Sequence, residues 1–233
     1  MVYPPSRKRI SLFLKLIVAA AAAVGVIRSA NAGSSSFMGG IHVFMFFTIQ
    51  SNIAIALICA YGALCLLQNR TLSSLYYLIQ FVGTVSITLT GMVFCFVLAP
   101  TLGRFAWALN NVLTHVVVPI AAVLDLFVSG IFGNVKGKDL PYVALPPLAY
   151  ALYAGIGYLA GWEFLDGVNY PYFFLNWGSP AGAFGFSKEL PFMGCVWWIL
   201  LLLLFLIGVG WLYLAVLRRL RQRAGIPNPD PNR

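Results

Sequence analysis

The stretch that decides the fold lies near the end of the chain: Val196-Trp-Trp-Ile-Leu-Leu-Leu-Leu-Leu-Phe-Leu-Ile-Gly-Val-Gly-Trp-Leu-Tyr-Leu-Ala-Val-Leu217, followed directly by Arg218-Arg-Leu-Arg-Gln-Arg223. The apolar part carries no charged side chain, and about 20 apolar residues are enough for a helix to cross the hydrocarbon core of a bilayer. A basic cluster directly after such a stretch is typical of the cytosolic flank of a span. The sequence therefore predicts a transmembrane helix that ends in the cytosol.

The whole chain has the composition of an integral membrane protein. Of its 233 residues 61% are hydrophobic and only 9% are charged, and its mean hydropathy is +0.87. Such a chain must be solvated largely by lipid. Its apolar windows are long, without the short alternation of a β-barrel, so they predict helices. We expect an all-α, single-domain bundle of six transmembrane helices, at roughly Ile10–Ile27, Ile41–Leu67, Leu75–Pro100, Ala108–Phe132, Pro141–Gly161 and Pro191–Leu217, with an aromatic outer connection at Trp162–Leu190.

The basic residues predict the orientation of the bundle. If both termini and the second and fourth connections share one side, twelve of the fifteen Lys and Arg residues fall there, and only Arg28, Arg104 and Lys188 fall on the other. The positive-inside rule then places both termini in the cytosol. The net charge of +9 is mostly this topology signal. It gives no support for nucleic-acid binding, although the basic C-terminal tail could touch anionic lipid.

The first window imitates a secretory signal peptide. Arg7-Lys-Arg9, an apolar run and Ala30-Asn-Ala32 occur in the order that such signals have. Lys15 inside the apolar run and Arg28 just before the cleavage-like site do not fit this anatomy. We expect a retained span whose charged side chains reach towards the membrane surfaces.

Two polar positions in apolar spans are the candidate catalytic residues. His115 lies in Asn111-Val-Leu-Thr-His-Val-Val-Val-Pro119, and Thr48 lies in Phe46-Phe-Thr-Ile-Gln-Ser-Asn52. Ionisable groups inside a membrane usually face a protein interior and have a function. A threonine hydroxyl beside an imidazole base is the minimum of a nucleophilic site. At 1.5 Å per residue both positions fall at similar depth in the outer half of the bilayer, so contact at about 3 to 5 Å is expected.

Further polar residues share helix faces with this pair. Ser51 and Asn52 lie on the same helix face as Thr48, with Gln50 nearby, and Asn111 lies one turn from His115. These four residues are candidates for substrate binding or oxyanion support, and Asn52 or a backbone amide could bind the oxyanion. Pro119 cannot donate to the His115 carbonyl, which predicts a kink and a free acceptor there. A third polar stripe is formed by Gln80, Thr84 and Thr88. Together these stripes predict a polar, hydrated pocket that opens outward.

Several alternatives stay open at this point. Thr48 could bond the Phe44 carbonyl one turn back, and amides within spans often bridge helices. Asp125 lies about 15 Å along the helix from His115, so it cannot complete a triad; it would pair with a neighbouring helix or with Lys136 or Lys138. The chain could instead be a small-molecule or ion carrier, or could bind haem through His42 and His115. Cys59, Cys65, Cys95 and Cys195 lack metal-ligand spacing, so neither a metal nor a cofactor is expected.

The two candidate motifs, together with Pro119, Asp125 and Tyr170-Pro-Tyr-Phe-Phe-Leu-Asn176, resemble the androgen-induced and androgen-dependent six-span membrane proteins and their bacterial six-pass relatives. The animal members are intramembrane threonine hydrolases that cleave fatty acid esters of hydroxy fatty acids. The resemblance covers the whole chain. It implies that Thr48 is the nucleophile and His115 the base, and that an acyl-threonine intermediate is released by water.

The resemblance also implies a membrane lipid or fatty ester as substrate and the cytoplasmic membrane of a bacterium as location. The flanks of both motifs look closer to the bacterial branch, and Asn176 stands where the family pattern leads us to expect an aspartate. The substrate therefore need not be the animal lipid. The outer aromatic connection, Trp162 to Trp177, would cap the site.

Overall fold

The computed structural model describes residues 4–32 and 40–226, which form a helical bundle with two isolated β-bridges in the outer connection. Among these residues, six helical segments are long and apolar enough to cross a membrane, so the predicted number of helical spans is confirmed. They comprise Pro5–Asn31, Phe47–Leu67, Ser74–Leu102, Leu109–Phe132, Gly137–Leu159 and Cys195–Arg223.

Three of the spans are single α-helices, and three are composite. The single helices are α1 (Pro5–Asn31), α2 (Phe47–Leu67) and α8 (Cys195–Arg223). The third span joins α3 (Ser74–Val93), a π-helical segment (Phe94–Leu98) and α4 (Ala99–Leu102). The fourth joins α5 (Leu109–Val112), a π-helical segment (Leu113–Val117), α6 (Val118–Ser129) and a 3₁₀ turn (Gly130–Phe132). The fifth joins a 3₁₀ segment (Gly137–Ala144) to α7 (Leu145–Leu159).

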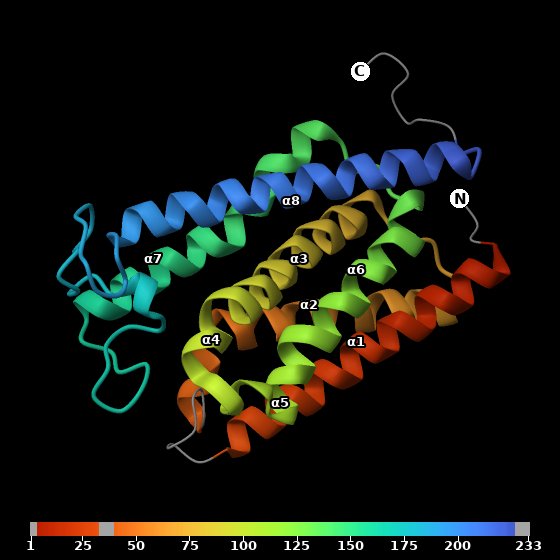
Figure 1. Ribbon diagram of the computed structural model, residues 1–233. Helices are drawn as coiled ribbons and strands as arrows, with labels where there is room; N and C mark the ends of the chain where they lie inside the picture. Colours follow the sequence, from red (N-terminus) through yellow and green to blue (C-terminus); the bar gives the residue numbers. More distant parts are fainter. Residues whose placement is uncertain (1–3, 33–39, 227–233) are drawn as a thin grey trace.

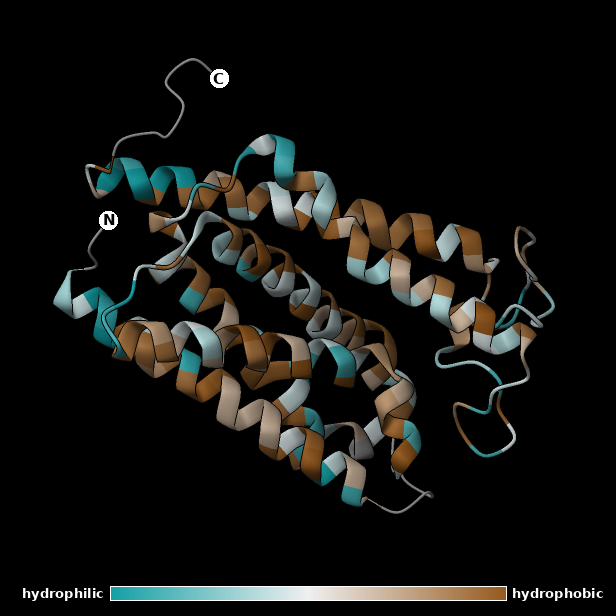
Figure 2. Ribbon diagram, turned by 180° about the vertical axis from the view of Figure 1, so that it is seen from behind, coloured by the Kyte–Doolittle hydropathy of each residue, from teal (hydrophilic) through white to brown (hydrophobic). Residues whose placement is uncertain are grey.

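Four helices, α1, α2, α3 and α6, form a closely packed part of the bundle. α1 packs against α2 and α6, and α3 packs against α2 and α6. α7 and α8 lie along the other side of α3, and the start of α1 and the end of α8 lie at the same end of the molecule (Figure 1). The helices are mostly apolar along their length (Figure 2), and many of their large hydrophobic side chains are exposed, as expected for helices that face lipid.

The second span starts later than its hydropathy predicts. Ile41–Met45 is a 3₁₀ segment, Phe46 has extended backbone angles (φ −89°, ψ 140°), and α2 begins only at Phe47. Thr48 therefore lies in the first turn of α2 instead of two turns inside a helix. Backbone N–H groups in a first turn have no partner within the helix, and the helix dipole favours negative charge there.

The third and fourth spans each contain a π-helical segment, Phe94–Leu98 and Leu113–Val117, and the rings of Phe94 and His115 stack between them. The second of them, Leu113–Val117, directly precedes α6, whose second residue is Pro119. A Cβ placed on Gly91 would lie 2.8 Å from the His115 carbonyl oxygen, so only a glycine lets α3 approach this closely. Pro119 cannot donate to the His115 carbonyl, and this carbonyl lies against Gly91 in the structure. Short π segments within α-helices often occur at functional sites.

Candidate active site

Thr48 contacts a tyrosine from the outer connection. The Thr48 hydroxyl lies 3.4 Å from the hydroxyl oxygen of Tyr172, and the Thr48 backbone N–H donates to the same oxygen at 3.4 Å. Burial raises the pKa of the Tyr172 phenol to about 12, although the hydrogen bond with Thr48 acts in the opposite direction. The Phe44 carbonyl instead accepts from Gln50 Nε2 at 3.1 Å. The Thr48 hydroxyl therefore contacts Tyr172 and not the Phe44 carbonyl one turn back, which is the usual partner of a threonine that serves only packing.

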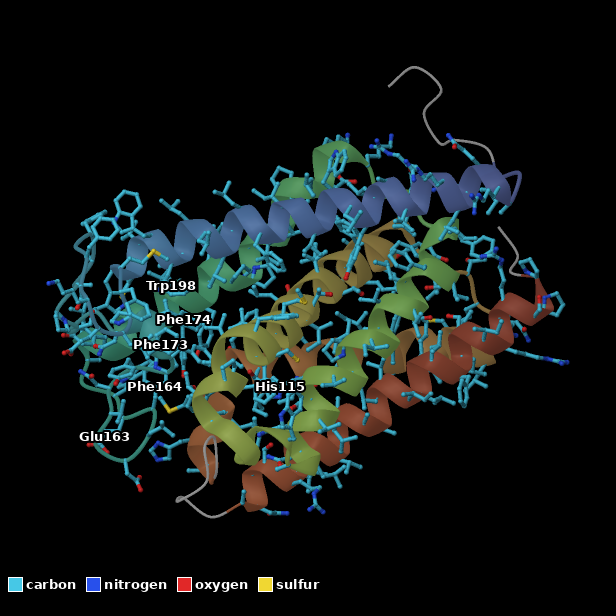
Figure 3. All side chains as sticks on the ribbon, in the orientation of Figure 1. His115, Glu163, Phe164, Phe173, Phe174 and Trp198 are labelled. Atoms are coloured by element: carbon cyan, nitrogen blue, oxygen red, sulfur yellow. The ribbon has the colours of Figure 1, made fainter. Side chains whose placement is uncertain are left out.

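A small apolar cavity adjoins this contact. Its volume is about 60 Å³, which is room for about two water molecules at roughly 30 Å³ each. Thr48 and Thr90 supply hydroxyl groups to a wall that is otherwise mostly aliphatic and aromatic. Tyr172 and Phe174, from the Trp162–Leu190 connection, form part of the cavity wall. Figure 3 shows Phe173, Phe174 and Trp198 gathered at this end of the bundle.

His115 is buried in the bundle; its ring nitrogen Nδ1 is hydrogen-bonded, whereas Nε2 has no hydrogen-bond partner among the described residues. Nδ1 lies 3.0 Å from the Asn111 carbonyl oxygen and 3.0 Å from the Thr114 hydroxyl. Because a carbonyl can only accept, Nδ1 must carry the hydrogen, which leaves Nε2 as an unprotonated acceptor. Nε2 is buried and has no hydrogen-bond partner in the described part of the chain. The ring stacks on Phe94, with centroids 3.8 Å apart (Figure 3 labels His115).

Asn52 clamps the two candidate motifs together. Its Nδ2 donates to the Thr48 carbonyl at 2.8 Å and to the Thr114 carbonyl at 3.1 Å. Thr48 and the residue next to His115 therefore lie on neighbouring helices at the same level. The Thr48 hydroxyl and the His115 ring are not hydrogen-bonded to each other in the described structure, because their bonds go to Tyr172, Asn111 and Thr114.

The amide hydrogens of Asn52 are both used in this clamp, so Asn52 has no donor left for an oxyanion. Its role is the helix-bridging one that the sequence left open as an alternative. Ser51 likewise donates to the Thr48 carbonyl at 3.0 Å and lies 2.8 Å from the Thr90 hydroxyl, which ties α2 to α3. Asn111 contributes its backbone carbonyl to His115. These neighbours position the two candidate catalytic residues.

A much wider groove runs between α2, α3 and α7. Its volume is about 590 Å³, within the roughly 300 to 1,000 Å³ of ordinary ligand pockets. The walls are mostly apolar, with Gln50, Ser51 and Ser86 among the few polar residues. Phe47 and Tyr150, whose rings are 5.3 Å apart, line both this groove and the small cavity beside Thr48. The two spaces are therefore separated by this aromatic pair.

Asp125 belongs to a second buried polar cluster, whose central contact is an ion pair with Lys15 of α1. Lys15 is 0% and Asp125 1% exposed, so Lys15 does not extend towards the membrane surface, and that expectation was wrong. Ser11 donates to Asp125 at 2.6 Å and Gln80 at 2.8 Å. Asp125 thus pairs with a neighbouring helix, one of the two predicted alternatives, and the pair ties α1 into the bundle.

The polar stripes do not form the hydrated pocket that the sequence predicted. Gln80 joins the Asp125 cluster, and Thr88 donates to the Thr84 carbonyl at 2.8 Å and lies 3.0 Å from the Tyr213 hydroxyl. The Thr84 hydroxyl is buried and has no partner among the described residues. Gln80 and Thr88 thus bridge helices, which is a common role of polar side chains in membrane spans. The cavity beside Thr48 is mostly apolar as a result.

His42 lies against the Trp162–Leu190 connection, away from His115. Its Nδ1 is 2.8 Å from the Glu163 carbonyl oxygen, and Figure 3 shows Glu163 in the outer connection and His115 within the bundle. Phe94 covers one face of the His115 ring. This arrangement does not favour a haem held between the two histidines.

Sequence reasoning missed Tyr172 as a site residue. It lies 124 residues from Thr48, and hydropathy and helical spacing give no signal for so distant a contact. Only the resemblance to the six-span family drew attention to the Tyr170–Asn176 segment. Comparison with protein-family models, with curated proteins and with solved structures gave no match, so membership of the family stays a prediction.

Proposed function

We propose that this protein is an intramembrane hydrolase that cleaves a long-chain fatty ester with Thr48 as nucleophile and His115 as base. The observation that carries the proposal is the free Nε2 of His115. This nitrogen is a buried acceptor whose protonation is set by the Asn111 carbonyl, and buried acceptors without a partner are rare in proteins. An imidazole that must accept a proton during a reaction needs this arrangement.

The surroundings of Thr48 also support the proposal. Its hydroxyl lines a cavity whose wall is mostly aliphatic and aromatic, and a groove large enough for an acyl chain lies on the other side of Phe47 and Tyr150. An ester could enter this groove laterally from the bilayer, because its walls belong to membrane-spanning helices. Neither space is suited to a hydrophilic substrate.

In the proposed reaction, the Thr48 oxygen bonds to the ester carbonyl carbon while its hydrogen passes to His115 Nε2. Collapse of the tetrahedral intermediate breaks the bond to the alcohol oxygen, which takes the proton from His115. Water then attacks the acyl-threonine, His115 accepts its proton and returns it to Thr48, and the fatty acid leaves. Thr48 and His115 share no hydrogen bond without substrate. The hydroxyl proton of Thr48 must therefore reach His115 Nε2 either after a side-chain movement or by way of a water molecule.

We further propose that the protein lies in a bacterial cytoplasmic membrane with both termini in the cytosol. Lys15 is buried against Asp125 and does not count as a cytosolic charge, and Arg233 lies outside the described residues. The remaining basic residues still favour this orientation. The Arg218–Arg223 cluster at the end of α8 would then contact anionic lipid headgroups.

The test is covalent capture of the nucleophile. Purified full-length protein is treated with a long-chain fluorophosphonate, the modified residue is mapped by mass spectrometry, and hydrolysis of long-chain esters is measured in parallel. We expect labelling at Thr48, loss of labelling and hydrolysis in Thr48→Ala, and loss of hydrolysis in His115→Ala. Thr88→Ala, which removes an intramembrane hydroxyl elsewhere in the bundle, should behave like the wild type. Undiminished hydrolysis by Thr48→Ala would refute the proposal.

A further inference from the structure

We propose that Tyr172 is the oxyanion donor of the Thr48 site, so that its hydroxyl binds the negative oxygen formed when Thr48 attacks an ester. This inference rests on the proposed hydrolysis and adds a catalytic residue from the outer connection. Its basis is position: the Tyr172 oxygen lies 3.4 Å from both the hydroxyl and the backbone nitrogen of Thr48. An oxygen on the carbon bonded to Thr48 would be within reach of the same phenol.

The site has few other candidates for this role. Both amide hydrogens of Asn52 are bonded to backbone carbonyls, the Ser51 hydroxyl donates to Thr48 or contacts Thr90, and Tyr150 donates its hydroxyl hydrogen to the Met45 carbonyl at 3.1 Å. The Tyr172 hydroxyl interacts with Thr48 and also with the hydroxyl of Tyr150. Because its oxygen accepts from the Thr48 N–H, its hydrogen can turn to an incoming ester while that contact stays in place.

Aromatic packing fixes the Tyr172 ring at this place. The ring stacks on Phe174 with centroids 5.1 Å apart and an interplanar angle of 5°, and Phe46 meets it edge-on at 5.7 Å. Tyr150 lies on a further side, at 6.2 Å. A donor held before the reaction begins needs no reorganisation when charge develops, which is why fixed donors stabilise oxyanions well.

The chemical state of the phenol suits a donor and not a base. Because burial raises the pKa of Tyr172 to about 12, the hydroxyl keeps its hydrogen at neutral pH. The oxygen accepts from the Thr48 N–H in the first turn of α2, which leaves the O–H free to donate. Tyr172 transfers no proton in this role: its O–H donates to the oxyanion while the negative charge is there. When the tetrahedral intermediate collapses, that oxygen's electron pair re-forms the C=O double bond, the bond to the alcohol oxygen breaks, and the alcohol oxygen takes the proton from His115.

The experiment compares Tyr172→Phe with the wild type, in ester hydrolysis and in the rate of fluorophosphonate labelling at Thr48. Phenylalanine keeps the ring stacking and removes only the hydroxyl. We expect kcat to fall about 100- to 1,000-fold, the usual effect of losing one oxyanion donor, with KM nearly unchanged. Labelling should slow similarly, because the phosphonyl oxygen occupies the position of the oxyanion. Tyr213→Phe, which removes a buried hydroxyl paired with Thr88, is the matched control and should leave both rates unchanged.

The outcomes separate this inference from the proposed function. If Thr48→Ala is inactive while Tyr172→Phe keeps the wild-type kcat and labelling rate, the oxyanion role is refuted and the hydrolase stands. If Tyr172→Phe raises KM or lowers the unfolding temperature while kcat is unchanged, Tyr172 is only a packing residue and the inference is also refuted. If the wild type reacts with neither esters nor the fluorophosphonate, the proposed function fails, and this inference fails with it.

Discussion

At the scale of single residues, the Lys15–Asp125 pair carries the greatest energetic consequence. Both groups are buried, and Ser11 and Gln80 satisfy further lone pairs of the carboxylate. Burying one charge without its partner is costly, whereas removing both charges together is often nearly neutral. The pair therefore makes the position of α1 depend on that of α6.

We predict that Lys15→Met and Asp125→Asn each lower the free energy of unfolding by about 3 to 5 kcal/mol, because each leaves one buried charge unpaired. The double variant should recover most of the loss, since the amide oxygen that replaces the carboxylate could still accept from Ser11 and Gln80. Thermal unfolding in detergent measures this, with Lys8→Met at an exposed position as the control. Single variants as stable as the wild type would show that the pair is not coupled to folding.

The site residues differ in how far the sequence could reveal them. Thr48 and His115 were visible because polar side chains stand out in apolar spans. The Nδ1 contact of His115 with Asn111 follows from one-turn spacing within a helix. The role of Asn52 as a clamp and the contact of Tyr172 with Thr48 depend on which helices and loops lie side by side, and no local pattern contains that information.

At the scale of elements, the local breaks in the spans shape the site. Hydropathy predicted a continuous second span from Ile41 because residues 43–47 are all apolar and include no proline or glycine. The extended backbone at Phe46 instead starts α2 next to Thr48. Pro119 did reveal a disturbance in the fourth span, but hydropathy could not show that it would take the form of a π-helical segment.

Gly91 tests the close approach of α3 to the π-helical segment at His115. We predict that Gly91→Ala lowers the free energy of unfolding by about 1 to 3 kcal/mol, the usual cost of overpacking, because the new methyl group would meet the His115 carbonyl and Pro119. The measurement is again thermal unfolding in detergent. Gly208→Ala in α8 is the control, since a Cβ there has no neighbour within 4 Å. If the two variants unfold at the same temperature, α3 does not depend on this contact.

At the scale of the whole molecule, the six spans and their order follow from hydropathy alone, because bilayer thickness sets the length of each helix. The arrangement of the spans does not follow from it. The polar stripes suggested a hydrated interior, whereas the structure pairs those groups across helices and leaves the open space between α2, α3 and α7. Packing between faces that are all apolar has no periodic signal in the sequence.

Filling the groove tests whether substrate enters through it. We predict that Ala149→Trp, in the α7 wall, lowers kcat/KM for long-chain esters on the order of 100-fold, since displacing the reacting atoms by about 1 Å can cost that much. Hydrolysis of short acetate esters, which do not need the groove, should change little. Ala60→Trp places the same side chain on the exposed face of α2 outside the groove and serves as control. Equal effects of both variants on long-chain esters would exclude the groove as the entry path.

The ion pair between α1 and α6 also has a consequence for biosynthesis. Lys15 emerges from the ribosome 110 residues before Asp125, which at about 5 to 20 residues per second is a delay of roughly 5 to 20 s. During this time α1 carries an uncompensated lysine, which costs about 2.5 to 3.5 kcal/mol at the centre of a newly inserted helix. We therefore expect the first helix to stay beside the translocation machinery, or in a shallow position, until the fourth span arrives, and the bundle to close late in translation.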